Sequence, residues 1–272
     1  MVTRGERRGA RLCAVGDLQG DGARDALLDV VDLGVTFGGV RALDGVALRV
    51  DEGAIVGLIG PNGAGKTTFI DSVCGFVPHR GEVRFGGMAI EHLASHRRAR
   101  AGLARTWQSL ELFDDLTVAE NCLVAVPAGG MRSVVSSLLR PRAHHGDGVV
   151  AEALAMVGLA DQADLLPTEL SLGQRKLVGV ARALAARPRL VLLDEPAAGL
   201  DSEESLRFGD HLRTIAEAGV AVLLVDHDMG LVLGTCEHVY VLDAGWIIAS
   251  GTPAEIRRDP GVIAAYLGEG VG

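Results

Sequence analysis

One nine-residue segment, 60–68, has the residue types and spacing that bind the phosphates of a nucleotide. It fits G-x-x-x-x-G-K-[ST] and follows an apolar run over 54–59 that is typical of a strand buried on both faces of a parallel sheet. Glycines in such a loop let backbone N–H groups turn towards phosphate oxygens, and the start of the next helix adds partial positive charge. The Lys66 amine would then reach the β and γ phosphates, and the Thr67 hydroxyl would hold Mg²⁺. The residues assigned to this site are Gly60, Pro61, Asn62, Gly63, Ala64, Gly65, Lys66, Thr67 and Thr68.

Two carboxylates, Asp194 and Glu195, directly follow a second apolar run over 190–193. At the end of a buried strand, Asp194 could hold Mg²⁺ through water, and Glu195 could orient and deprotonate an attacking water. Acidic pairs after strands are common, so this pair alone does not separate a functional role from a structural one. The sequence contains no N-K-x-D motif for reading guanine, which disfavours a GTPase.

A third segment lies between these two and reads Leu170-Ser171-Leu172-Gly173-Gln174. It precedes a helical pattern over 174–186, so Ser171 and the amides of that helix start form a second anion site. This segment resembles the signature motif of ABC-type ATPases, with Leu172 in place of the first glycine of L-S-G-G-Q. The resemblance implies that two cassettes pack head to tail. Each ATP·Mg²⁺ then lies between the phosphate loop of one subunit and Ser171, Gly173 and Gln174 of the other.

The resemblance extends over about residues 28–268 and assigns roles to further residues. It implies that Phe37, 29 residues before Lys66, stacks on adenine. It also implies that Gln108, in Arg105-Thr106-Trp107-Gln108, touches Mg²⁺ and the attacking water and senses a transporter partner.

Two more family positions follow the carboxylate pair. Asp201 corresponds to the fixed carboxylate of the loop that crosses to the opposite site of the dimer. His227, 32 residues after Glu195, corresponds to the histidine that contacts the γ phosphate. The resemblance thus implies Glu195, His227, Lys66 and Gln108 as catalytic residues, and Thr67, Gln108 and Asp194 as the residues that hold the metal.

Two stretches, 102–121 and 253–268, resemble the ATPase subunits of branched-chain amino-acid importers. That subgroup implies a subunit that hydrolyses ATP to power uptake of branched-chain amino acids or similar small polar solutes. Its expected partners are transmembrane permease subunits, a second identical or homologous ATPase subunit and, indirectly, a solute-binding protein. It would lie at the cytoplasmic face of the membrane, with the permease docked in a groove bounded by Gln108 and the segment 110–117.

Two other functions stay open at this point. One is the ATPase of an ABC exporter for lipid or lipopolysaccharide, whose core would look nearly the same. The other is a soluble ABC ATPase that acts as a nucleic-acid-associated switch. The latter usually has fused cassettes or long coiled insertions, and the net charge of -9 gives no basic footprint for nucleic acid.

The elements that must position these residues follow from the hydrophobic pattern. Apolar runs over 54–59, 190–193 and 220–225 predict strands of a buried parallel sheet, and the last two follow helical stretches. Alternating residues over 28–33 and 43–50 predict antiparallel strands with one wet face. We therefore expect an α/β fold of the P-loop NTPase (RecA-like) type: a mostly parallel sheet core, an antiparallel β subdomain and an inserted α-helical subdomain.

We also expect a disordered N-terminal tail over 1–26 and one ATPase domain over 27–268. Helices are predicted over 67–74, closed by Gly75, and over 149–159 and 174–186. The divisions expected within the domain are a nucleotide-binding core over 27–108 and 176–248, a helical subdomain over 109–175 with an irregular excursion at 127–148, and a C-terminal family segment over 249–268.

The chain has 272 residues and no apolar stretch near the roughly 18 residues of a membrane-spanning helix. Of its 26 basic residues only Lys66 and Lys176 are lysines. Lys66 fits the phosphate loop because a compact ammonium on a flexible stem can pass through it where a broad guanidinium could not. Lys176 is predicted to have no role in chemistry.

Overall fold

The computed structural model describes residues 26–106, 111–127 and 147–267. Predictions for Gln108, for residues 1–25 of the tail and for 128–146 of the excursion concern residues outside these ranges. The first strand begins at Ala26, the last residue assigned to the tail.

In the described residues, an antiparallel sheet has the strand order β2-β1-β4-β5. Its strands are β1 (Ala26–Phe37), β2 (Val40–Asp51), β4 (Arg80–Phe85) and β5 (Met88–Ala89). β1 and β2 pair antiparallel with Val30 opposite Leu48, which confirms the predicted pair of strands. Val46, Leu48 and Val50 are buried and alternate with less buried residues, so one face of the sheet packs inward.

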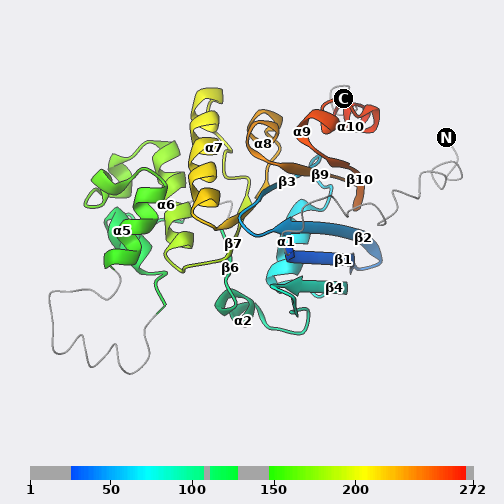
Figure 1. Cartoon of the computed structure of the whole chain (residues 1–272), viewed down its shortest axis with the longest axis horizontal. Coiled ribbons are helices and arrows are strands. Elements are labelled where there is room, and N and C mark those ends of the chain that lie inside the picture. Colours follow the sequence, from blue (N-terminus) through cyan, green and yellow to red (C-terminus); the bar gives the residue numbers. More distant parts are fainter. Residues whose placement is uncertain (1–25, 107–110, 128–146, 268–272) are drawn as a thin grey trace, which may run out of the picture.

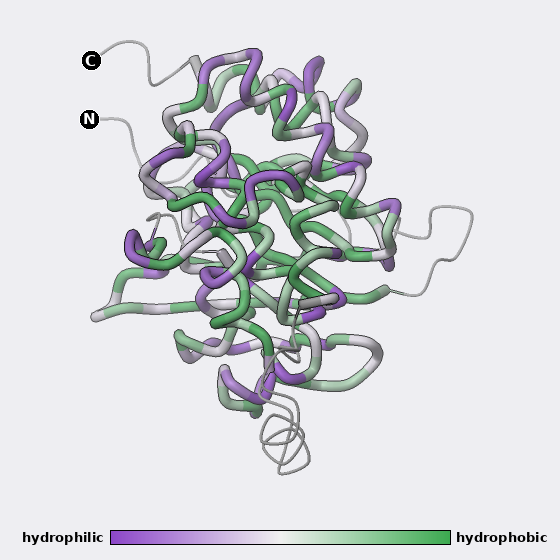
Figure 2. The backbone as a smooth tube through the Cα atoms, turned by 90° about the vertical axis from the view of Figure 1, so that its left-hand side faces the viewer, coloured by the Kyte–Doolittle hydropathy of each residue, from purple (hydrophilic) through white to green (hydrophobic). Residues whose placement is uncertain are grey.

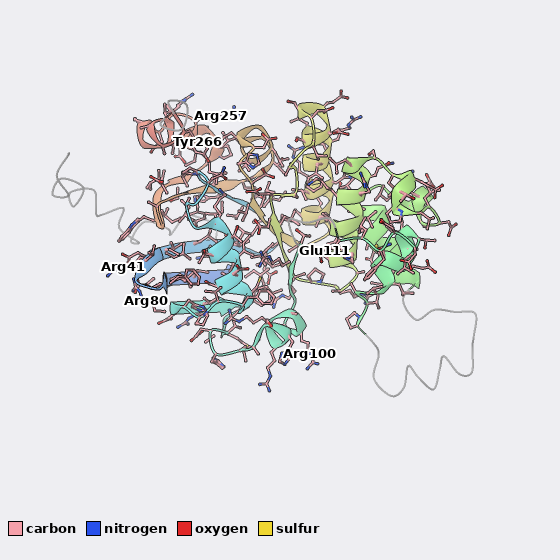
Figure 3. All side chains as sticks on the ribbon, turned by 180° about the vertical axis from the view of Figure 1, so that it is seen from behind. Arg41, Arg80, Arg100, Glu111, Arg257 and Tyr266 are labelled. Atoms are coloured by element: carbon pink, nitrogen blue, oxygen red, sulfur yellow. The ribbon has the colours of Figure 1, made fainter. Side chains whose placement is uncertain are left out.

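Ion pairs made by arginines connect three strands of this sheet. Arg80 of β4 pairs with Asp44 of β2 at 2.6 Å and with Asp32 of β1 at 3.0 Å. Arg41 also pairs with Asp44 at 2.6 Å. Figure 3 shows Arg41 and Arg80 at the same side of the molecule, on the antiparallel strands. The buried carboxylate of Asp44 thus has two guanidinium partners.

The larger sheet has the strand order β10-β9-β3-β8-β7-β6 among the described residues. Its strands are β3 (Ile55–Ile59), β6 (Leu103–Arg105), β7 (Leu190–Asp194), β8 (Ala221–Val225), β9 (His238–Asp243) and β10 (Trp246–Gly251). All these strands pair parallel except β10, which is antiparallel to β9. Every residue of β3, β7 and β8 is buried, as the continuous apolar runs predict. The fold class is therefore confirmed, and the segments after β3, β7 and β8 leave the sheet at one edge.

Helices flank this sheet (Figure 1). They are α1 (Lys66–Cys74), α2 (Ser95–Arg100), α3 (Val118–Leu123), α5 (Asp147–Met156), α6 (Leu172–Leu184), α7 (Ser202–Glu217), α8 (Met229–Thr235), α9 (Pro253–Ile256) and α10 (Pro260–Leu267), with short 3₁₀ turns η3 (Ala160–Gln162) and η4 (Pro167–Glu169). α1 confirms the predicted helix, and Gly75 ends it in a left-handed conformation with φ of 80°.

The helices predicted over 149–159 and 174–186 differ at both ends from α5 (Asp147–Met156) and α6 (Leu172–Leu184). α6 begins at Leu172 rather than 174 because the Ser171 side chain caps it. α5 ends at Met156 rather than 159 because Gly158 turns the chain with φ of 68°. The predicted division between residues 175 and 176 falls inside α6, and the one between 248 and 249 falls inside β10.

Each buried strand contributes to two hydrophobic cores. Ile55 and Ile59 of β3 face a core formed with α3, α5, α6, α7 and α8, whereas Val56 and Leu58 face a core formed with α1 and the antiparallel sheet. In Figure 2 the hydrophobic stretches of backbone gather in the interior. The sheet is therefore fixed from both sides, and the loops at its edge start from rigid strands. Among the described residues, no helix combines the length and apolar character needed to cross a bilayer.

Candidate functional site

The loop after β3 is shaped by glycines that no other residue could replace. Gly60 and Gly65 have φ of 155° and 111°. A Cβ on Gly60 would lie 2.0 Å from the carbonyl oxygen of Leu242, and one on Gly65 would lie 2.8 Å from that of Ala42. The loop can therefore pack its main chain tightly against neighbouring strands.

Lys66 begins α1 and is only 6% exposed. Its Nζ donates hydrogen bonds to the carbonyl oxygens of Gly60 at 2.6 Å and Pro61 at 3.0 Å. The N-terminus of α1 has no side-chain cap, and no acidic residue lies in its first turn. A bare helix start beside a fixed ammonium, with the exposed Thr67 next to it, fits a nucleotide triphosphate.

Asp194, the last residue of β7, is buried and ion-paired. Nη2 of Arg105 donates to its Oδ2 at 3.0 Å, and Nη1 of Arg105 donates to Asp71 on α1. Burial raises the pKa of Asp194, and the Arg105 charge and hydrogen bond oppose that rise. Sequence reasoning quoted Arg105 only as part of a motif and missed this ion pair. The parallel pairing of β6 with β7, which places Arg105 opposite Leu192, brings it there.

Glu195 and His227 approach each other at the ends of β7 and β8. Glu195 has a left-handed φ of 48°, and its N–H donates to the Val225 carbonyl at 2.7 Å. Oε2 of Glu195 lies 4.0 Å from Nδ1 of His227, with the glutamate side chain 18% exposed and the histidine 57% exposed. The geometry brings an acid and a histidine together at an accessible edge of the sheet.

Asp226 stabilises this arrangement through hydrogen bonds, a role that the sequence did not reveal. It is fully buried. Its Oδ1 accepts from the N–H of His227 at 2.8 Å and of Asp228 at 3.0 Å, and its Oδ2 accepts from the Ala197 N–H at 3.2 Å. One carboxylate therefore connects the loop that bears His227 to the segment that follows Glu195.

The signature segment caps its own helix. The Ser171 hydroxyl accepts from the Gln174 N–H at 3.2 Å, and the Gln174 side chain accepts from the Ser171 N–H at 2.9 Å. A hollow of about 390 Å³ adjoins this helix start and is lined by Ser171, Gly173, Gln174, Leu200, Glu204, Arg207 and His211 among others. Asp201 caps α7 through the Glu204 N–H at 2.8 Å, a structural role in addition to the predicted one.

Phe37 ends β1 and is 51% exposed. Phe37 is therefore not a core residue of the strand. Its exposed ring can offer a face for stacking. Gln108 lies outside the described residues, so its place relative to the other residues stays a prediction.

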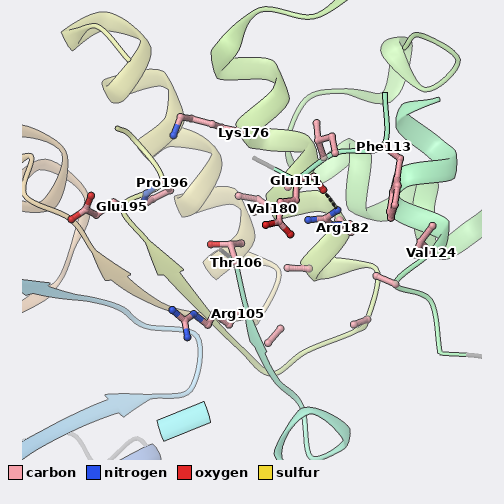
Figure 4. A pocket seen from close by; sticks show the side chains of 16 residues that line it. Arg105, Thr106, Glu111, Phe113, Val124, Lys176, Val180, Arg182, Glu195 and Pro196 are labelled. Carbon is pink, nitrogen blue, oxygen red and sulfur yellow. Dashed lines mark hydrogen bonds between the residues drawn. The ribbon is translucent and has the colours of Figure 1, made fainter. Parts of the chain in front are cut away.

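A groove of about 430 Å³ opens between the end of β6, α3 and α6 (Figure 4). Its apolar wall includes Phe113 and Val124, which are 49% and 59% exposed. Asn121 is buried and shapes this wall, because its Nδ2 donates at 3.0 Å to the carbonyls of Phe113, Leu116 and Thr117. The groove includes part of the segment 110–117 that the sequence predicts as a dock.

Lys176 lines the same groove with Glu195. It is 9% exposed, and burial lowers its pKa while the nearby charges of Asp226 and Glu195 oppose that shift. Lys176 is therefore a buried residue of the signature helix near two carboxylates, and the prediction that it has no role in chemistry stays a prediction.

Comparisons with known proteins agree with this geometry. The model of the ABC transporter family matches residues 43–198, and that of the branched-chain amino acid ATP-binding cassette transporters matches residues 247–272. The high-affinity branched-chain amino acid transport ATP-binding protein BraF of Pseudomonas aeruginosa is 39% identical over 89% of this chain and 98% of its own length. LivG of Escherichia coli, which bears the same description, is 37% identical over 89% and 98%. The lipopolysaccharide export system ATP-binding protein LptB of Escherichia coli is 37% identical over 90% and 98%.

Solved structures show the same fold. A nucleotide-free ATP-binding cassette from an ABC transporter superposes with a TM-score of 0.78 and 30% identity, covering 89% of this chain and 99% of that one. The ADP conformation of MJ1267, an ATP-binding cassette of an ABC transporter, gives a TM-score of 0.80 and 30% identity over 90% and 99%. The chain belongs to the ABC transporter family and is one of its nucleotide-binding ATPase subunits.

Proposed function

We propose that this chain is the ATP-hydrolysing subunit of an importer for branched-chain amino acids or similar small polar solutes. The match of residues 247–272 to the branched-chain amino acid cassette model is the observation that supports it most directly. The relatives BraF and LivG point the same way. The alternative is the ATPase of a lipid or lipopolysaccharide exporter, which the likeness to LptB supports at similar identity.

Residues 60–68 are the proposed binding site for ATP and its Mg²⁺. The glycine-shaped loop, the uncapped start of α1 and the oxygen donors Thr67 and Asp194 fit this pair. When bound, Mg²⁺ would neutralise charge that develops on the transferred phosphoryl group. Lys66 would exchange its carbonyl partners for phosphate oxygens, and Gln108 would be a third metal-holding residue. The ring of Phe37 would stack on adenine.

Hydrolysis would then depend on Glu195 and His227. Glu195 accepts a proton from the attacking water, and His227, 4.0 Å away, helps to hold that water and the γ phosphate. Ser171, Gly173 and Gln174 of a second ATPase subunit, identical or homologous, close over the nucleotide, with Asp201 at the crossing loop. Closure excludes water from the site and strengthens the field on the phosphates.

The proposed location is the cytoplasmic face of a membrane, through transmembrane permease subunits. The groove beside Phe113 and Val124 is open, apolar and adjacent to Glu195, which suits an inserted permease segment. A solute-binding protein would act indirectly, because the ATPase does not touch the solute. Crosslinks between a cysteine at Val124 and the cognate permease are expected in the assembled complex, and their absence would contradict the dock.

The catalytic assignment is tested with Glu195→Gln. This variant should bind ATP as the parent does and accumulate a closed dimer, while hydrolysis falls by about 100-fold or more. Size-exclusion chromatography with ATP and phosphate release measure the two effects. Hydrolysis at the parent rate would show that Glu195 is not the base.

The direction of transport and the class of transported solute are tested in cells. Removing the chain should abolish uptake of labelled leucine, and the parent but not Glu195→Gln should restore it. Unchanged uptake together with a defect in lipid export would favour the exporter instead.

A further inference from the structure

A single guanidinium connects the proposed metal site to the groove. Arg105 is the last residue of β6, and its side chain is 7% exposed. It donates to Asp71 on α1 and, at 3.0 Å, to Asp194 on β7. Arg105 thus joins the helix that starts at the phosphate loop to the strand that ends in the metal-holding carboxylate.

The contact fixes how Asp194 is oriented. The guanidinium holds Oδ2, while Oδ1 makes no hydrogen bond within the described residues. Both side chains are almost fully buried, at 7% and 4% exposure, so water screens this pair weakly. One positive charge between two carboxylates also leaves the cluster with a net negative charge, which attracts a cation.

The same residue also belongs to the groove. Arg105 and Thr106 line it, and the Thr106 N–H donates to the Leu192 carbonyl of β7 at 2.9 Å. Figure 4 shows the Arg105 guanidinium pointing away from Phe113 and Val124, which lie on the other side of β6. A displacement of the groove at β6 would therefore move the group that holds Asp194.

We infer that Arg105 is a positioning residue. It holds Asp194 in the orientation that serves Mg²⁺, and it transmits movement of the groove to that carboxylate. The first part concerns the chain alone. The second part rests on the proposed function, because it requires a permease in the groove.

The first part is tested with two variants. Arg105→Lys keeps the charge but cannot fork between two carboxylates, and Arg105→Gln removes the charge. Binding of a fluorescent, non-hydrolysable ATP analogue is measured in EDTA and then during titration with Mg²⁺. In EDTA both variants should bind within about twofold of the parent. The Mg²⁺ concentration for half-maximal response should rise by about threefold for Arg105→Lys and about tenfold for Arg105→Gln, as for residues that orient metal ligands.

The matched control is Arg84→Gln, because Arg84 pairs with Glu82 on the exposed face of β4 at 3.0 Å. It should leave both measurements unchanged. A merely structural role for Arg105 predicts equal losses in EDTA and Mg²⁺ together with a lower melting temperature. That result, or an unchanged Mg²⁺ titration, would overturn the inference. If Arg105→Gln does not fold, Arg105→Lys decides.

The second part is tested in the assembled transporter with Arg105→Lys at saturating Mg²⁺. Basal hydrolysis by the isolated variant is measured alongside, and the ratio of permease-stimulated to basal hydrolysis should be lower for the variant than for the parent. Equal stimulation of parent and variant would overturn the coupling role and leave the metal role intact. Failure of the parent to assemble with any permease would count against the proposed function, and the Mg²⁺ titration of the isolated chain would still decide the first part.

Discussion

Two helix starts in this chain are proposed to meet phosphate, and they are built differently. α1 begins after Gly65, has no side-chain cap and contains the buried Lys66 at its first position. α6 begins after Ser171, which exchanges two hydrogen bonds with Gln174. The first N–H groups of any helix need partners from outside it. α1 leaves that need to a ligand, whereas α6 meets part of it internally.

The difference indicates two kinds of anion site. The phosphate loop is a complete site because its main chain, its ammonium and its helix start converge within residues 60–68. The signature end is exposed at Ser171 and supplies only one side of a site. It can contribute to phosphate binding once a second subunit brings the nucleotide to it. Substitutions at the two helix starts should therefore affect different steps, ATP binding for α1 and hydrolysis by the dimer for α6.

The largest effect is expected from Lys66→Met at the first end. Methionine keeps the buried stem but removes the ammonium. Loss of charge-assisted hydrogen bonds of about 3 kcal/mol should weaken ATP binding by about 100-fold. Calorimetric titration of the isolated chain measures this, and circular dichroism checks the fold. Parent-like affinity would show that the phosphate loop does not depend on its lysine.

A smaller and different effect is expected from Ser171→Ala. The isolated chain should bind ATP as the parent does, because its own phosphate loop is intact. Hydrolysis by the dimer should fall by about tenfold, since one donor to the γ phosphate is lost. Loss of the cap should also reduce the free energy of unfolding by about 1 kcal/mol.

Thr252→Ala is the matched control for that variant. Thr252 forms the same capping box with Glu255 on α9, near the C-terminus. It should lose similar stability without losing hydrolysis. If both variants lose hydrolysis equally, the effect of Ser171→Ala comes from stability and the signature end has no special role.

The two ends also show what a sequence can predict. The phosphate loop is a continuous motif after a strand whose apolar run marks burial on both faces, so Lys66 and the strand over 55–59 could be placed in advance. The partners of Asp194 could not. Arg105 reaches it only because β6 pairs with β7, 89 residues apart in the chain. The start of α6 was also misplaced by two residues, because the hydrophobic pattern marks the buried face of a helix and not its cap.

Buried titratable groups were equally hard to predict. Lys176 has no motif of its own, and its surroundings come from two loops at the sheet edge. Asp226 likewise acts through main-chain N–H groups of Ala197, His227 and Asp228, which no spacing rule reveals. Local motifs thus predicted the residues proposed to meet the ligand better than the residues that hold them in place.

The smallest expected effect is on the pH dependence of stability, and it concerns a histidine beside the start of α6. His211 lines the hollow beside Ser171, and burial lowers its pKa below the ordinary 6.5. The unfolded chain therefore binds a proton at this residue more readily than the folded chain does. The contribution of His211 to stability is complete above pH 6.5 and is lost as the pH falls from 6.5 through the lower folded pKa. Removing this titration should flatten the pH dependence of stability.

His211→Gln should thus reduce the loss of unfolding free energy between about pH 7 and pH 5, measured by denaturant titration at each pH. Part of the slope should remain, because burial also lowers the pKa values of His79 and His238. ATP binding by the isolated chain should respond to pH identically in parent and variant, since His211 lies on the signature side. A slope equal to that of the parent would mean that His211 titrates alike in the folded and unfolded chain, and that the signature end has no acid sensitivity of its own.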